Sequence, residues 1–132
     1  MKRVFATLAL LAAALPLRAE LPPSAYEAMQ REASEVLRIN VLNVQETASE
    51  NPAVTDVNVV AEVLKVGRSA AKLNPGDMIT ITYHIADHPS GWVGPGEIPL
   101  LKDMTESIAY LKPVPETNEY TPAAGAMSFS QF

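Results

Sequence analysis

One pattern constrains the fold of this chain more than any other: apolar residues recur at every second position in several segments between Leu37 and Leu111. The alternation is cleanest in residues 78–85, where one set of positions is apolar or aromatic and the other is polar. The two sets are Ile79, Ile81, Tyr83 and Ile85 against Thr80, Thr82 and His84. Successive side chains of a β-strand point to opposite faces of its sheet, so this segment is predicted to be a strand with an apolar inward face.

Four other segments are predicted to form strands. The strongest, Val57–Val66, is largely apolar on both faces near its end, which favours a central position in the sheet over an edge. The turn Asn74-Pro75-Gly76-Asp77 precedes the strand at 78–85, because proline presets one backbone angle and glycine accepts an angle that other residues resist. The remaining strands are predicted at 37–45, 98–101 and 107–111.

A single helix is predicted before these strands. Ser24 is a good N-cap, and Glu27 three residues later completes a capping box. The apolar residues share one face at helical spacing, the charged residues lie mostly elsewhere, and the helix ends near residues 33–35. The apolar face holds Tyr26, Met29, Ala33 and Val36, and the charged set is Glu27, Arg31, Glu32 and Glu35.

The first nineteen residues have the form of a secretory signal peptide. A positive start, Lys2-Arg3, is followed by an apolar run from Val4 to Leu15 that is interrupted only by Thr7. The run is shorter than the roughly 20 apolar residues that span a bilayer, and it lacks the polar face of a soluble amphipathic helix. Cleavage after Ala19 is predicted, which places the mature protein in the periplasm or the medium with no membrane span.

Composition limits what the mature part can be and bind. The chain has no cysteine, so the core must hold the domain without disulfides. Without Lys2, Arg3 and Arg18 it keeps seven basic residues against 15 acidic ones, a net charge near −8. Such a surface repels phosphate backbones and anionic lipid, which argues against nucleic-acid binding. A cationic partner or a merely soluble surface are both compatible with it.

The expected organisation is a mainly β, small barrel with one N-terminal helix after the signal peptide, because several short strands in so small a chain favour a barrel that closes its own edges. The predicted boundaries are 1–19 for the signal peptide, 20–35 for the helix, 36–115 for the barrel and 116–132 for a C-terminal tail. The tail either docks through its aromatic residues or stays loose.

Several of these segments also occur in a familiar order. They are Val57–Ser69, the turn at 74–77, Ile79–Tyr83, Pro99–Leu101 and Ile108–Leu111. In this order the sequence resembles the netrin-module and metalloproteinase-inhibitor-like branch of the OB-fold over about residues 36–112. The resemblance implies a small OB-like β-barrel that acts as a binding module. The inhibitors bind zinc through an N-terminal cysteine and are braced by disulfides, so their activity does not carry over to a chain without cysteine. The end of the chain, 120–125, is similar to that of small exported bacterial proteins.

The residues offer little for catalysis. Ser90 and Ser107 have no nucleophile-elbow context, and the glycines at 91–96 do not form a phosphate-binding loop between a strand and a helix. No enzyme activity and no cofactor are predicted. The alternative is a small metal-binding protein or metal-dependent enzyme that uses His84, Asp87 and His88, although a third nitrogen or sulfur ligand is absent.

The predicted binding element is the loop from Asp87 to Pro99, which is rich in glycine and holds the only tryptophan, Trp92. This side chain is either an exposed anchor for a partner or a lid over the barrel end. Tyr83, Tyr110 and Tyr120 are the next candidates. The sequence therefore predicts an exported noncatalytic binding or accessory module whose partner is another protein of the cell envelope. A purely structural component of an envelope complex is a further alternative.

Replacing Trp92 with alanine tests the loop. We expect weaker capture of the partner in a pull-down, because an aromatic anchor contributes more to an interface than its neighbours do. The domain should remain folded, as judged by its circular-dichroism spectrum. Intact capture, or outright unfolding, contradicts the assignment of this site.

Overall fold

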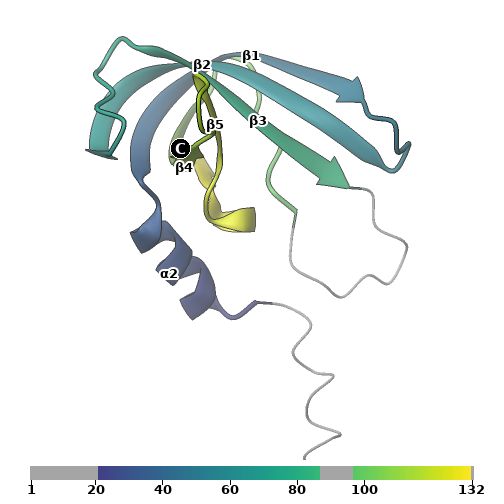
Figure 1. Ribbon diagram of the computed structural model, residues 1–132, viewed down its shortest axis with the longest axis horizontal. Coiled ribbons are helices and arrows are strands. Elements are labelled where there is room, and N and C mark those ends of the chain that lie inside the picture. The colour runs from purple at the N-terminus through teal and green to yellow at the C-terminus, as the bar shows by residue number, and fades with distance from the viewer. Residues whose placement is uncertain (1–20, 87–96, 132) are drawn as a thin grey trace, which may run out of the picture.

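The chain folds into a mainly β, closed five-stranded barrel with one helix, as seen in a computed structural model that describes residues 21–86 and 97–131 (Figure 1). The helix α2 spans Pro23–Glu32, and a 3-10 turn, η2, spans Gly125–Met127. The strands are β1 (Glu35–Ala48), β2 (Val54–Ser69), β3 (Met78–Ala86), β4 (Glu106–Pro113), β5 (Glu119–Pro122) and β6 (Phe129–Gln131). The predicted signal peptide lies outside the described residues. Of those described, no helix is both long and apolar enough to cross a bilayer.

The barrel closes because its first strand pairs on both sides. The order β1-β2-β3-β5-β4 returns to β1 through a β1–β4 ladder. The short strand β6 pairs with residues 107–109 of β4, along the edge that does not face β1. All pairings are antiparallel except that of β3 with β5, where Ile81 lies opposite Tyr120. A five-stranded barrel of this kind fits the predicted OB-like fold.

The two longest strands have an irregular register. The pairs Leu37–Val66 and Ile39–Val63 both point inward, yet they are separated by two residues on β1 and by three on β2, so one β2 residue is left over. Further shifts lie between Val36 and Leu37 and between Val41 and Asn43. Such bulges bend a strand and increase its twist, which lets β1 pair with β4 as well as with β2. Figure 1 shows β1 and β2 curving together from the end that carries α2.

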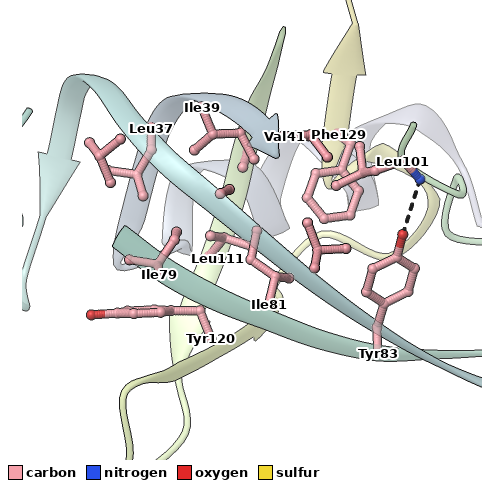
Figure 2. Packing of buried hydrophobic residues seen from close by; sticks show 14 of the residues in the cluster. Leu37, Ile39, Val41, Ile79, Ile81, Tyr83, Leu101, Leu111, Tyr120 and Phe129 are labelled. Atoms are coloured by element: carbon pink, nitrogen blue, oxygen red, sulfur yellow. Dashed lines mark hydrogen bonds between the residues drawn. The ribbon is translucent and has the colours of Figure 1, made fainter. Parts of the chain in front are cut away.

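The core fills the barrel with side chains from every barrel strand (Figure 2). The alternation predicted for β3 is confirmed, since Ile79, Ile81 and Tyr83 are buried while His84 is exposed. The ring of Tyr83 lies 5.7 Å, centroid to centroid, from that of Phe129 on β6. Larger aliphatic members of the core are Leu37, Ile39, Val41, Val63, Leu101 and Leu111. The prediction that β2 is central is also confirmed, because it pairs with both β1 and β3.

Residues 98–101 were predicted to be a strand and are not one. Proline has no N–H for a ladder, and the segment is held by a side chain instead. The Tyr83 hydroxyl donates to the Pro99 carbonyl at 2.9 Å. It also accepts from the Leu101 N–H at 3.3 Å, as the dashed line in Figure 2 shows. These bonds position Leu101 as a buried core residue without a strand.

The predicted end of the barrel at residue 115 differs from the structure. The fifth strand, β5, lies within the segment 116–132 that the sequence indicated as a tail, and it joins β3 to β4. Four residues that end in a proline are too few to show a period of two, which is why the alternation did not reveal this strand. The tail docks by its aromatic residues, since Tyr120 and Phe129 are both buried.

The predicted start of the helix is wrong in detail. The N-cap is Pro22, no side chain caps the helix, and Pro23 begins the first turn, where a missing N–H costs nothing. The Ser24–Glu27 capping box therefore does not form. The helix ends at Glu32, and Glu35 belongs to β1 rather than to a charged helix face.

Glu35 is completely buried, and its carboxyl group ties three segments together. Its oxygens accept hydrogen bonds from the Ser34 hydroxyl, from the Ser69 hydroxyl at 2.9 Å and from the Ala71 N–H at 2.7 Å. Burial of a carboxyl group is tolerable only with such partners. Glu35 thus fixes the start of β1 to the end of β2 and to the connection that follows it.

We expect Glu35→Gln to lower the free energy of unfolding by about 2 kcal/mol, because an amide has one acceptor oxygen where the carboxyl group has two. The midpoint of urea denaturation at unchanged m-value measures the change. Glu32→Gln, at an exposed position, is the matched control and should stay within about 0.5 kcal/mol of the parent. Equal stability of the Glu35 variant contradicts the structural role.

Candidate functional site

The structure separates the residues that were predicted to bind a partner. Trp92, Asp87 and His88 lie outside the described residues. Tyr83 and Tyr120 are core residues, only 4% and 7% exposed, and so offer almost no surface to a partner. Tyr110 is the exception, since it is half-buried on the outward face of β4.

Of the predicted metal ligands, the structure describes His84. Its side chain is 73% exposed, and its Nδ1 lies 2.6 Å from the Asp56 carboxyl on the neighbouring strand β2. The two described parts of the chain hold no cluster of three histidine or acidic side chains that would suit a metal ion. Two of the three residues of the metal hypothesis, Asp87 and His88, lie outside these parts, so that hypothesis stays a prediction.

A different surface gathers cationic and apolar side chains around Tyr110. On the outer face of the barrel, the register places Tyr110, Val36 and Arg68 in one row across β4, β1 and β2. The next row holds Ile108, Arg38 and Lys65, and the third holds Glu106, Asn40 and Glu62. All nine are half-buried or exposed, as outward positions of a barrel should be. We call the first two rows, together with Gly67 and the adjoining face of α2, the outer groove.

The groove exists because of the irregular register of β2. Leu64 has no partner between Lys65 and Val63, and Gly67 has none between Arg68 and Val66. Each leftover residue is a bulge that restores the outward direction for the next cation. Gly67 lies so close to β1 that an added Cβ would sit 3.2 Å from the Val36 carbonyl oxygen. Because Gly67 has no side chain, β1 and β2 can approach each other closely at the bottom of the groove.

Two connected hollows form the groove. One, of about 480 Å³, lies between α2 and the first row, and the other, of about 350 Å³, lies over the second row. They share Val36 and Gly67. The first hollow adjoins a third, apolar one of about 520 Å³ between α2 and η2, which is lined by Leu21, Tyr26 and Met127 among others.

The groove is cationic on one side and apolar on the other. Arg31, Arg38, Lys65 and Arg68 line it, which is four of the seven basic residues that remain after the predicted signal peptide. Arg38 pairs with Glu106 at 2.9 Å, whereas Arg31, Lys65 and Arg68 make no ion pair with any residue in 21–86 or 97–131. Val36, Ile108 and Tyr110 supply the apolar side.

Arg68 also positions the helix that forms the wall of the groove. Its Nε donates to the Ala33 carbonyl and its Nη2 to the Gln30 carbonyl, both at 2.9 Å. A cation at a helix C-terminus satisfies carbonyls that have no partner within the helix. On the opposite side, Gln30 Nε2 donates to the Met127 carbonyl at 2.9 Å. The helix is thus held to the barrel by polar contacts, and none of its residues is buried.

Sequence reasoning missed this groove. Its basic residues are spread from Arg31 to Arg68, and they appear as scattered charges along the chain. The available signal was the breakdown of alternation after Val63, where Leu64-Lys65-Val66-Gly67 departs from a period of two. That breakdown marks the bulges, but it does not reveal which strand lies alongside.

No protein-family model matches the chain, and no curated protein is significantly similar to it.

The two buried tyrosines predict a loss of stability at alkaline pH. Burial raises the pKa of Tyr83 above 10.0, the Leu101 N–H opposes the rise and the charge of Glu46 adds to it. Burial and the charges of Glu35 and Asp77 raise the pKa of Tyr120. These hydroxyls lose their protons at a lower pH in the unfolded chain than in the folded one. The free energy of unfolding is therefore unaffected by them below about pH 10, and it falls as the pH rises from there toward the folded-state pKa values.

We therefore expect the denaturation midpoint to fall less steeply above about pH 10 in a Tyr83→Phe, Tyr120→Phe double variant than in the parent, because these groups no longer ionise on unfolding. The difference in phenolate absorbance between the parent and the variant reports the titration of Tyr83 and Tyr120 directly, since both proteins keep the other two tyrosines. Its appearance at the ordinary tyrosine pKa would contradict the effect of burial.

Proposed function

We propose that this chain is an exported, noncatalytic binding or accessory module of the cell envelope that holds a partner protein in its outer groove. The observation that carries the proposal is the pair of rows in which cations of β1 and β2 stand beside apolar side chains of β1 and β4. Hot spots of protein interfaces are enriched in tyrosine and arginine, the residue types of Tyr110 and Arg68. Barrels of the OB type usually bind on one face and its adjoining loops.

The chemistry of the groove supports binding over catalysis. Its lining residues are apolar, cationic, or the amide and carboxyl groups of Gln30 and Glu27. Among the lining residues, Tyr110 carries the only hydroxyl, and none is a histidine or a serine. A hydroxyl nucleophile needs an adjacent base to be activated.

The resemblance to the netrin-module and metalloproteinase-inhibitor-like branch supports the same proposal, because those barrels act by binding other proteins. The chain's lack of cysteine excludes their N-terminal zinc-binding group, so the surface used here differs. Export into the periplasm or the medium follows from the predicted signal peptide and is part of the proposal. The contribution of Trp92 stays a prediction.

A panel of synthetic peptides tests the proposal. Three peptides of equal length alternate apolar residues with glutamate, glutamine or lysine, and each is titrated into the ¹⁵N-labelled protein. We expect at least one to shift the amide signals of Val36, Gly67 and Tyr110 in a saturable way, because their side chains or backbone form the groove. Thr82, on the outward face of β3, is the internal control and should not move. Absence of groove shifts with every peptide at millimolar concentration contradicts the proposal.

A further inference from the structure

We infer that the ligand of the outer groove is an acidic, extended segment of a partner polypeptide, with two carboxylates spaced two residues apart. This inference rests on the proposed function and adds the chemical class of the ligand. It is drawn from three properties of the groove: an unfavourable pair of cations, the pairing of β1 and β4 along both of their edges, and carboxylates that border the cationic rows.

The first property is the cross-strand pair Arg38–Lys65, which are directly opposite each other in the β1–β2 ladder. Like charges in this position destabilise an antiparallel pair. Glu106 balances Arg38 at 2.9 Å, but Lys65 makes no ion pair with the described residues, and Arg68 stands in the next row. A bound carboxylate would relieve this repulsion, so the pair favours the state with an anion bound over the free state.

The second property is that β1 and β4, the two strands that carry the apolar side chains of the groove, are paired on both sides. β1 lies between β2 and β4, and β4 has β1 on one side and β5 and β6 on the other, whereas β2 pairs with β3 only as far as Glu62. The part of a ligand that lies over β1 and β4 therefore cannot join the sheet as an added strand through backbone hydrogen bonds. It must be recognised by its side chains, which the cations and the apolar side chains of the groove can contact.

The third property is the acidic border. Beyond the second row the strands present Glu106 and Glu62, and Glu27 stands at the helix side of the first row. A bilayer of anionic lipid or a long polyanion would bring its charge against these carboxylates as well. A short acidic segment does not, because its carboxylates end where the cationic rows end. This contrast favours a polypeptide segment over a lipid surface.

The geometry also sets the spacing of the ligand's carboxylates. Successive rows are two residues apart along β1 and β4, and three along β2, where each bulge adds one residue. Residues two apart in an extended chain face the same side at about 6.8 Å, the spacing of the rows on β1 and β4. One carboxylate therefore reaches the Arg38–Lys65 row while the second reaches Arg68. Apolar residues of the ligand can then lie on Val36, Ile108 and Tyr110.

The decisive variant is Lys65→Glu, which replaces the repulsion between Arg38 and Lys65 by an attraction between opposite charges. Titrated with a blocked octapeptide that has two glutamates two residues apart, the variant should bind about tenfold more weakly than the parent. Its melting temperature should rise by about 2–4 °C, because opposite charges across an antiparallel pair stabilise it. Loss of affinity with a gain of stability separates a ligand site from a merely structural one.

Lys102→Glu is the matched control. It makes the same change of charge at an exposed position in the connection before β4, and it should bind the peptide within about twofold of the parent, since the groove cations are untouched. If Lys65→Glu does not fold, Lys65→Gln removes the cation without adding a charge and should still weaken binding several-fold. Unchanged affinity of a folded Lys65 variant overturns the inference.

The ligand class is tested with the same protein. The glutamate peptide should bind more tightly than a glutamine version, and more tightly when its two glutamates are two residues apart than when they are adjacent. Equal or tighter binding of the glutamine peptide in the groove overturns the inference while the proposed function stands. Binding to phosphatidylglycerol vesicles that Lys65→Glu abolishes overturns the choice of a polypeptide. Groove signals unmoved by any peptide overturn the proposed function itself.

Discussion

The structure depends on β1 pairing along both of its edges. The first half of this strand is hydrogen-bonded to β2 on one side and to β4 on the other, and only this double ladder turns an open sheet into a barrel. Leu37, Ile39 and Val41 are consequently enclosed from all directions and are almost fully buried. In a chain without disulfides, this ladder joins the first described strand to the last third of the chain, from which β4, β5 and β6 all come.

Bending a strand far enough to pair on both edges requires bulges, and here the bulges also build the surface. The residues left over on β2, Leu64 and Gly67, keep Val63 and Val66 inward while Lys65 and Arg68 remain outward. The same irregularity therefore completes the core and sets two cations in successive rows beside Arg38. Buried Glu35 extends this arrangement, because its bonds to Ser69 and Ala71 fix the position at which β2 leaves the ladder.

The parts of the fold that could be predicted are those in which local pattern and tertiary environment agree. β3 has one wet and one dry face, so its alternation is visible in the sequence, and the turn at Asn74–Asp77 forms with Gly76 at φ 96°. β5 was not predictable, because parallel pairing with β3 is decided by contacts between distant residues. Glu35 looked like a solvated helix residue, since nothing local reveals the donors Ser69 and Ala71. The candidate site was missed for the same reason: only the ladders bring Tyr110 and Ile108 beside Arg38.

A cationic groove on a negatively charged protein has a consequence for selectivity. The chain carries a net charge of −5 even with the basic residues of the predicted signal peptide included, so its long-range field repels anions. Only a ligand whose negative charge is confined to a short segment gains from Lys65 and Arg68 without meeting Glu27, Glu62 and Glu106. In the binding role that we propose, the surrounding carboxylates act against the wrong partners, while the groove supplies attraction to the right one. Specificity of this kind needs both attraction and repulsion. The bulges of β2 turn Lys65 and Arg68 outward, in rows that are bordered by the carboxylates.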